Sequence, residues 1–221
     1  MTLVSVREAA DRLDVTVRQA QRLAHAGKLE AIGIDRIDYA SVLHLMAARQ
    51  GHHYRAWTQD TAWGAVAILS GVRAGWMGQV QRSRLKSELR KMTGTELVAR
   101  TRNRASVHRL HGHASAALRL RDGIVASGNT AALGDITAAM NRVDGYIGED
   151  AYEGLVRDYG LVEAWDGNVT LRTTGFDVAV IERLATADSV LAALDLAKSL
   201  DTRERTTGLG ILNRVLEHLS G

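Results

Sequence analysis

The sequence predicts a mainly α chain with small β elements, an α+β fold, on three observations. Proline is absent from all 221 residues, so no pyrrolidine ring interrupts a helix. Apolar residues recur at helical spacing in most segments, whereas the alternation typical of strands occupies only short stretches. A hydrophobic fraction of 46% is enough for an ordinary core. The length allows two or three small domains, and we expect three, at residues 1–50, 57–121 and 122–221.

Two closely spaced helices open the first expected domain. Ser5 with Glu8, and Thr16 with Gln19, have the spacing of capping boxes, in which a hydroxyl accepts from an amide of the first helical turn. The first helix must therefore end near Asp14. The apolar positions recur at helical spacing in both helices: Val6, Ala9, Ala10 and Leu13, then Val17, Ala20, Leu23 and Ala24.

A small hairpin, or wing, is expected next. Gly27 is a suitable left-handed cap for the second helix, and residues 28–38 then alternate loosely around Gly33. Asp38 is the expected cap of a third helix that runs to about Gln50. Two capped helices with a tight turn, followed by a wing, predict a winged helix-turn-helix.

The polar face of the second helix carries the candidate base contacts. Arginine pairs bidentately with guanine and glutamine with adenine, while a helix start favours phosphate. We expect eight residues of this domain to contact double-stranded DNA: Thr16, Arg18, Gln19, Gln21, Arg22, His25, Lys28 and Arg36. The alternative is an ordinary helical hairpin whose polar face is solvated.

The second expected domain is strongly basic, with 12 basic and 2 acidic residues between Arg73 and Arg121. Helices are expected over residues 58–69, 78–92 and 93–102, and two strands within residues 104–120. This order predicts a second, winged-helix-like region. Its candidate DNA contacts are Arg82, Arg84, Lys86, Arg90, Lys91, Arg100, Arg102 and Arg104. A solvated amphipathic helix is the alternative.

The third expected domain is acidic and mixed α/β. Residues 122–221 hold 8 basic and 16 acidic residues, against 20 and 9 in residues 1–121, which suggests two different partners. We expect a helix over residues 149–159 and a hairpin of strands 161–165 and 168–173, turning at Asp166-Gly167. Asp201 is the expected cap of a last helix, whose apolar stripe is Leu209, Leu212, Leu216 and Leu219.

Three short stretches carry a family resemblance in the first domain. They are the segment from Val6 to Val15, then Thr16-Val17-Arg18, then Ala26-Gly27-Lys28-Leu29. With them, residues 4–46 resemble the winged helix-turn-helix of excisionase and MerR-type proteins. The wing is shorter than in that pattern, and the aromatic residue often found in the second helix is missing.

The rest of the chain resembles a second family. The stretches that carry the resemblance are residues 124–128, 145–147, 167–172 and 193–205. They are similar to actinobacterial regulators related to the AbiEi antitoxins of type IV toxin–antitoxin systems. This resemblance implies an autorepressor that binds its own promoter, with a C-terminal domain for antitoxicity. It also implies a nucleotidyltransferase toxin as partner, which the alternative interpretation has the chain neutralise by direct contact. A stand-alone excisionase or MerR-like regulator is the other alternative.

Several function classes have no motif in the sequence. Phosphate-binding Walker loops, nucleophile elbows and zinc-protease motifs are absent, and there is no cysteine for a disulfide or a thiolate ligand. His108, His111 and His113 lack a nearby carboxylate, so phosphate contact or plain exposure is favoured over metal. We therefore expect no enzyme activity, no cofactor and no metal. Without an apolar run of membrane length or a secretory signal, a cytoplasmic location is expected.

Overall fold

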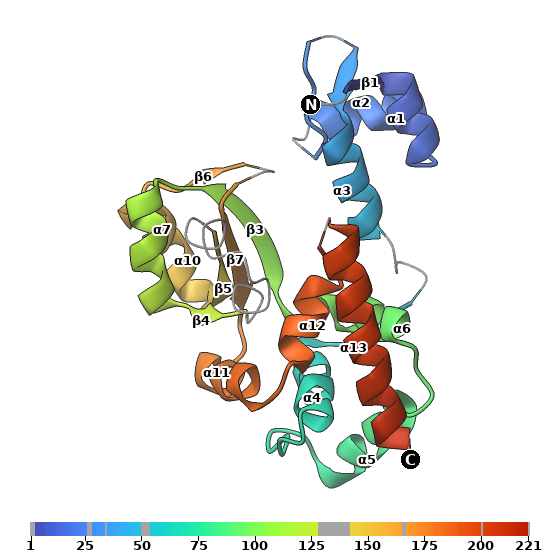
Figure 1. The fold of residues 1–221 in the computed structure, drawn as a ribbon, viewed down its shortest axis with the longest axis vertical. Helices are drawn as coiled ribbons and strands as arrows, with labels where there is room; N and C mark the ends of the chain where they lie inside the picture. The colour runs from blue at the N-terminus through green and yellow to red at the C-terminus, as the bar shows by residue number, and fades with distance from the viewer. Residues whose placement is uncertain are drawn as a thin grey trace. The chain divides into compact units, whose positions relative to one another are not determined.

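The structure is a computed structural model, and it divides the chain into two compact units, Met1–His52 and His53–Gly221 (Figure 1). It describes residues 3–25, 28–33, 35–49, 54–127, 142–164, 167–199 and 201–220. Helices and a small sheet coexist in the described chain, which is an α+β arrangement as expected.

The first unit consists of β1 (Leu3–Ser5), α1 (Val6–Arg12), α2 (Val17–His25), β2 (Arg36–Asp38) and α3 (Tyr39–Arg49). The two strands are antiparallel, with Val4 opposite Ile37. The expected N-terminal caps of α1 and α3 are both confirmed. Ser5 Oγ accepts a hydrogen bond from the amide of Glu8 at 3.1 Å, and Asp38 Oδ2 accepts one from the amide of Ser41 at 3.1 Å. The small core combines the strands with the inner faces of the helices.

The connection between α1 and α2 is tight. Asp14 takes a left-handed conformation with φ of 52°, and the amide of Val15 donates to the carbonyl of Ala10 at 3.0 Å. Val17 was expected to face the core but is 41% exposed. It is the first residue of α2, and the core contacts of this helix begin one turn later, at the fully buried Ala20. The expected cap Gly27 lies outside the described residues.

The second unit has three kinds of element. Its α-helices are α4 (Gln59–Leu69), α5 (Gln79–Leu89), α6 (Gly94–Arg100), α7 (Ala114–Leu120), α10 (Tyr152–Asp158), α11 (Val178–Ala187), α12 (Val190–Leu196) and α13 (Thr202–Ser220). Its 3-10 helices are η1 (Thr101–Arg104), η2 (Arg121–Gly123) and η3 (Glu149–Ala151). Its strands are β3 (Ser106–His111), β4 (Val125–Ala126), β5 (Val143–Gly148), β6 (Val162–Glu163) and β7 (Val169–Thr174).

The five strands form one sheet in the order β4-β5-β7-β3-β6. The β5–β7 pair is parallel and the other pairs are antiparallel. One face of the sheet packs against α7 and α10, as Figure 1 shows, around an apolar cluster that includes Leu110, Val143 and Leu171. A larger cluster joins the other helices of the unit and takes in Tyr146 of β5. Two apolar clusters therefore flank the sheet.

The expected boundary between residues 121 and 122 does not divide the structure. β3 comes from the basic segment, yet it pairs along its length with β7 from the acidic segment. The two expected strands within residues 104–120 are instead one strand and one helix, so a second wing is not formed there. The basic and acidic segments consequently share one unit.

The expected hairpin at residues 161–173 is also wrong. β6 and β7 are both neighbours of β3, which lies between them, and they do not pair with each other. Trp165 and Asp166 lie outside the described residues. The turn signal at Asp166-Gly167 predicted that β6 and β7 pair directly. Instead β3, about sixty residues earlier in the chain, lies between them.

The last helix matches its expectation. Asp201 Oδ1 accepts from the amides of Arg203 and Glu204 at 2.7 and 3.2 Å, which caps α13. Leu212 and Leu216 of its apolar stripe are buried in the helical cluster. Among the described helices, none combines the length and the apolar character that crossing a membrane requires.

Candidate nucleic-acid interface

The start of α2 is held by its own capping contact. Thr16 Oγ1 accepts from the amide of Gln19 at 3.2 Å, and the carbonyl of Thr16 accepts from the amides of Gln19 and Ala20. Ala20 then buries one side of the helix against α1. This anchoring turns the opposite side of α2 toward solvent.

Four polar residues of α2 share that outward side. Arg18, Gln21, Arg22 and His25 are exposed and together line a shallow hollow on the surface. No ion pair among the described residues engages either arginine, so both guanidinium groups keep their donors free. His25 Nδ1 lies 2.9 Å from the carbonyl oxygen of Gln21, which directs the other ring nitrogen outward. The surface presents a dense set of donors suited to acceptors on a polyanion.

The other candidates of the first unit are exposed as well. They are Thr16 and Gln19 at the start of α2, Lys28 after it, and Arg36 in β2. Arg36 belongs to a small hairpin in which the amide of Ile32 donates to the carbonyl of Arg36 at 2.7 Å. Gly33 supplies the positive φ of 78° that the turn of this hairpin needs. All eight candidates of this unit are therefore accessible to a ligand.

The candidates of the second unit separate into two groups. Arg84, Lys86 and Lys91 lie on or directly after α5, are exposed, and take part in no ion pair among the described residues. They flank the buried side of α5, which packs through Leu85 and Leu89. These three remain candidates for phosphate contact.

Three of the five remaining candidates, Arg82, Arg90 and Arg102, donate to backbone carbonyls of their own unit. Arg82 donates to the carbonyls of Ala74 and Met77, and Arg90 Nε donates to the carbonyl of Leu219 at the end of α13. Arg102 donates to the carbonyls of Tyr54 and Ala99. Arg82, Arg90 and Arg102 are therefore not free cations on the surface.

Arg100 is neutralised by two carboxylates. Its guanidinium forms ion pairs with Glu88 at 3.2 Å and Glu96 at 2.9 Å, and it lies over the rings of Tyr54 and Trp57. Glu88 and Glu96 are the two acidic residues between Arg73 and Arg121, and both pair with Arg100. Because its charge is neutralised in this way, Arg100 is a poor candidate for phosphate contact.

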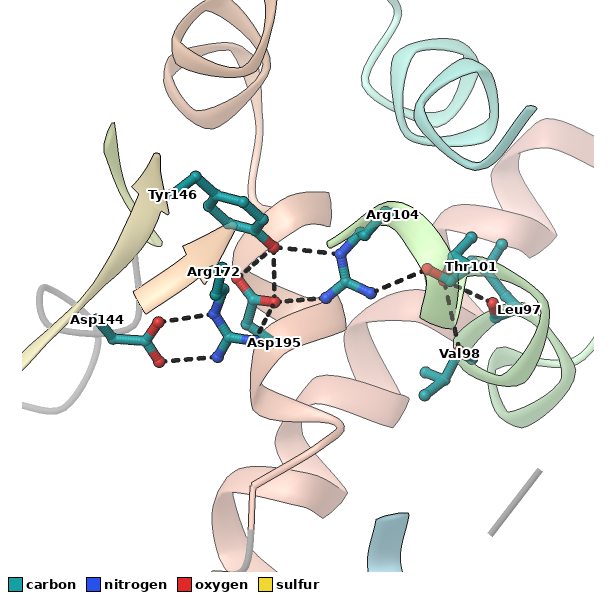
Figure 2. Close-up of polar contacts among 8 residues, drawn as sticks. All are labelled: Leu97, Val98, Thr101, Arg104, Asp144, Tyr146, Arg172 and Asp195. Carbon is teal, nitrogen blue, oxygen red and sulfur yellow. Dashed lines mark hydrogen bonds and ion pairs between the residues drawn. The ribbon is translucent and has the colours of Figure 1, made fainter. Parts of the chain in front are cut away.

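The prediction that Arg104 contacts DNA is wrong. Only 2% of it is exposed, and it forms an ion pair with Asp195 of α12 (Figure 2). It also donates to the hydroxyl of Tyr146 at 3.1 Å and to the carbonyl of Thr101 at 3.3 Å. A side chain that is enclosed and fully partnered in this way does not reach DNA.

Arg104 belongs to a buried polar network between the sheet and α12, drawn in Figure 2. Asp195 accepts from Arg172 Nη1 at 3.2 Å and from the hydroxyl of Tyr146 at 2.8 Å. Arg172 in turn donates to both carboxylate oxygens of Asp144 at 2.7 and 2.8 Å. Two cations and two anions thus neutralise one another inside the unit, as a buried ionic group requires.

The titration of the network follows from its burial and its charges. Burial by itself would raise the pKa of Asp195, but Arg172 and Arg104 outweigh it and hold that pKa below its usual value. Burial raises the pKa of Tyr146, so its hydroxyl stays protonated and donates. Four residues of the network, Asp144, Tyr146, Arg172 and Asp195, were not predicted from the sequence. The signal for the strand residues is polar side chains at alternate positions, Asp144 with Tyr146 and Thr170 with Arg172, in otherwise apolar strands.

The histidines of β3 do not assemble a metal site. His108 is half-buried, with Nε2 3.1 Å from the hydroxyl of Thr173 and its ring 4.2 Å from that of Tyr152. Burial lowers the pKa of His108, so the neutral ring is favoured. Within the described ranges, no group of three histidine, cysteine or carboxylate residues is placed to hold a metal ion.

The two units do not divide the charge of the chain. Residues 1–52 hold 7 basic and 6 acidic residues, and residues 53–221 hold 21 and 19. The asymmetry seen along the sequence therefore lies within the second unit.

Comparison with known proteins adds no relative: no family model, no curated protein and no solved structure matches this chain.

Proposed function

We propose that the chain is a sequence-specific DNA-binding transcriptional regulator, and that α2 is the recognition helix of a winged helix-turn-helix. The observation that carries this proposal is the exposed set of Arg18, Gln21, Arg22 and His25 on one side of α2. These side chains offer the donors and acceptors that distinguish base edges in the major groove.

The dimensions of the first unit support the proposal. An α-helix with its side chains is about 10–12 Å in diameter, which fits a major groove about 12 Å wide, and the nine residues of α2 give about 13 Å of helix to lie in it. α1 packs against α2 through the tight connection at Asp14, as the first helix of such a motif does. In this proposal the hairpin that carries Arg36 serves as the wing. Arg36 in the hairpin and Lys28 before it would then contact backbone phosphates.

Exposed cations on and after α5 supply a second, sequence-independent contact in this proposal. Arg84, Lys86 and Lys91 are exposed, and none of them has a carboxylate partner among the residues that the structure describes. Each phosphate that such a side chain neutralises steepens the log–log salt dependence by about 0.9. Replacing Lys86 by alanine should weaken binding to all sequences alike and reduce that slope by about 0.9.

Footprinting of the full chain on the promoter of its own gene tests the specific contact. A protected site is expected, and Arg22→Ala should weaken binding to it by about 1–3 kcal/mol. Arg7→Ala is the matched control, because Arg7 is an exposed arginine of the same unit on α1. Uniform weak protection with no preferred site would contradict the proposal, as would equal losses for both variants.

A second candidate function is contact with a protein partner, as the resemblance to antitoxins implies. The observation that favours it is an acidic surface on η3 and α10, where Glu149, Asp150, Glu153 and Asp158 are exposed. The partner would be a nucleotidyltransferase toxin with a basic docking face. Co-purification with the product of the neighbouring gene tests this, with the double variant Asp150→Lys, Glu153→Lys expected to lose the complex. Unchanged retention by that variant would contradict the assignment of this surface.

A further inference from the structure

The outward side of α2 is rich in hydrogen-bond donors and poor in acceptors. α2 contains no aspartate or glutamate, and the guanidinium groups of Arg18 and Arg22 can only donate. The acceptors on this side are the side-chain oxygen of Gln21 and, in the neutral ring, Nε2 of His25. His25 Nδ1 lies 2.9 Å from the carbonyl oxygen of Gln21, which can only accept, so Nδ1 carries the proton. Such a surface complements base edges that accept hydrogen bonds.

Guanine is the base that an arginine matches best. In the major groove it presents two neighbouring acceptors, N7 and O6, to which one guanidinium donates bidentately. Adenine and thymine each present a single acceptor there, and cytosine presents an amino donor that a carboxylate would accept. Because α2 offers two guanidinium groups and no carboxylate, its chemistry favours guanine over the other three bases.

The two arginines of α2 are available for such contacts. Both are exposed, and within the described part of the chain neither guanidinium has a hydrogen bond or an ion pair. Arg12 of α1 is also exposed, but it donates to the hydroxyl of Tyr39 at 2.8 Å and pairs with Glu8 at 2.9 Å. Free donors are therefore a property of Arg18 and Arg22 and not of every exposed arginine in this unit.

The spacing of these residues matches the spacing of base pairs. Arg18 and Arg22 are four residues apart, so they lie on one side of α2 and are offset by about 6 Å along its axis. Successive base pairs are about 3.4 Å apart, so two steps span about 6.8 Å. His25 is about 10.5 Å from Arg18 along the axis, or about three steps. A helix that lies along the groove thus faces about four base pairs.

We propose that α2 contacts two guanines in base pairs that are separated by one base pair, with Arg18 on one guanine and Arg22 on the other. The proposal rests on the proposed function, because it needs α2 to lie in the major groove. Each arginine then determines one base pair of the binding site. Loss of one arginine relaxes the preference at its own base pair and leaves the preference at the other.

Selection with the full chain from a pool of random duplexes, followed by base analogues, tests the proposal. The selected duplex should hold two guanines at this spacing. Each of them is then replaced in turn by 7-deazaguanine, which lacks the N7 acceptor, and the affinity should fall about five-fold or more. Hypoxanthine is the matched control base, because it keeps N7 and O6 and lacks only the minor-groove amino group. It should bind about as well as guanine.

Variants of the chain assign each guanine to its arginine. Arg18→Ala should lose the sensitivity to 7-deazaguanine at one of the two guanines and keep it at the other, and Arg22→Ala should show the reverse. Both residues are exposed, so neither change removes a core contact. Arg7→Ala, at an exposed arginine of α1, is the matched control and should keep both sensitivities.

Three outcomes would overturn the proposal. A preferred site without two guanines at this spacing would do so, as would equal sensitivity to both 7-deazaguanines in all three variants. Each of these leaves sequence-specific binding intact. The third outcome, no preferred site at all, overturns this proposal and the proposed function together, so the two failures are distinguishable.

Discussion

Asp195 of α12 lies 3.2 Å from Arg172 Nη1 of β7, and this ion pair joins the helical part of the second unit to its sheet. Both side chains are almost fully buried, and Arg104 and Tyr146 share the same carboxylate (Figure 2). The apolar cluster of the helices takes in Tyr146, and the cluster under α7 and α10 takes in Leu171, the neighbour of Arg172. The pair thus lies where the two apolar clusters meet.

Removing the charge of Asp195 should be strongly destabilising. Asp195→Asn leaves the buried Arg104 and Arg172 without their shared counterion, which typically costs about 3–5 kcal/mol of unfolding free energy. Denaturant unfolding of the full chain measures it. Asp158→Asn is the control, because the exposed ion pair between Arg157 and Asp158 contributes about 0–1 kcal/mol. Similar losses for the two variants would show that the network does not hold the unit together.

Lys198 should make stability depend on pH in the alkaline range. Its pKa is about 7 in the folded chain and about 10.4 when unfolded. Between these values the unfolded chain binds more protons, so the free energy of unfolding rises with pH across that window and is lowest below it. Lys198→Met should flatten the rise. Unfolding at about pH 7 and pH 10 in phosphate-free buffer measures the difference between the two proteins, and identical slopes would contradict the burial of this amine.

The crossing of α12 and α13 depends on Gly208. A Cβ there would lie 2.6 Å from the carbonyl oxygen of Ala193 and 2.5 Å from the amide nitrogen of Ala197, which are backbone atoms that cannot turn aside. Gly208→Ala should therefore lower the melting temperature. Gly210, two residues later in the same helix, has open space around it, so Gly210→Ala should stabilise by up to about 1 kcal/mol through helix propensity. Thermal unfolding of both variants compares them, and a stabilised Gly208→Ala would refute the close approach.

The boundary of the second unit predicts which fragments fold. Residues 53–221 contain every strand of the five-stranded sheet and should give a cooperative unfolding transition. Residues 122–221 lack β3, the strand between β7 and β6, and also Arg104, so they should be unfolded or aggregate. Circular dichroism with thermal melting distinguishes the two cases. A stable, cooperative 122–221 fragment would restore the boundary that the charge asymmetry suggested.

The caps and the helices that they start were predictable because their causes are local. Ser5, Asp38 and Asp201 each accept a hydrogen bond from an amide two or three residues later in the chain. Such a contact can be predicted from a short stretch of sequence. The apolar stripe of α13 was predictable for the same reason, since its period repeats within one helix.

The sheet and the network were not predictable, because their partners are far apart in the chain. Arg104 sits in a basic run that pointed to solvent, yet its partner Asp195 is 91 residues away. The turn signal at Asp166-Gly167 suggested a hairpin, but β3 takes the place between the two strands. A count of charged residues does not say which of them are buried. For that reason several arginines were predicted to lie on a basic surface, although they make contacts within the fold.

The central claim is that α2 reads DNA sequence, and a binding-site selection tests it most directly. The full chain is used to select from a pool of random duplexes, and the affinities for the selected and a scrambled duplex are then compared at one fixed salt concentration. The account predicts a preference of about 10³-fold or more, with Arg18→Ala and Arg22→Ala losing about 1–3 kcal/mol on the selected duplex alone. Arg7→Ala should leave that preference intact. Equal affinity for both duplexes, or a preference that neither α2 variant reduces, would contradict it.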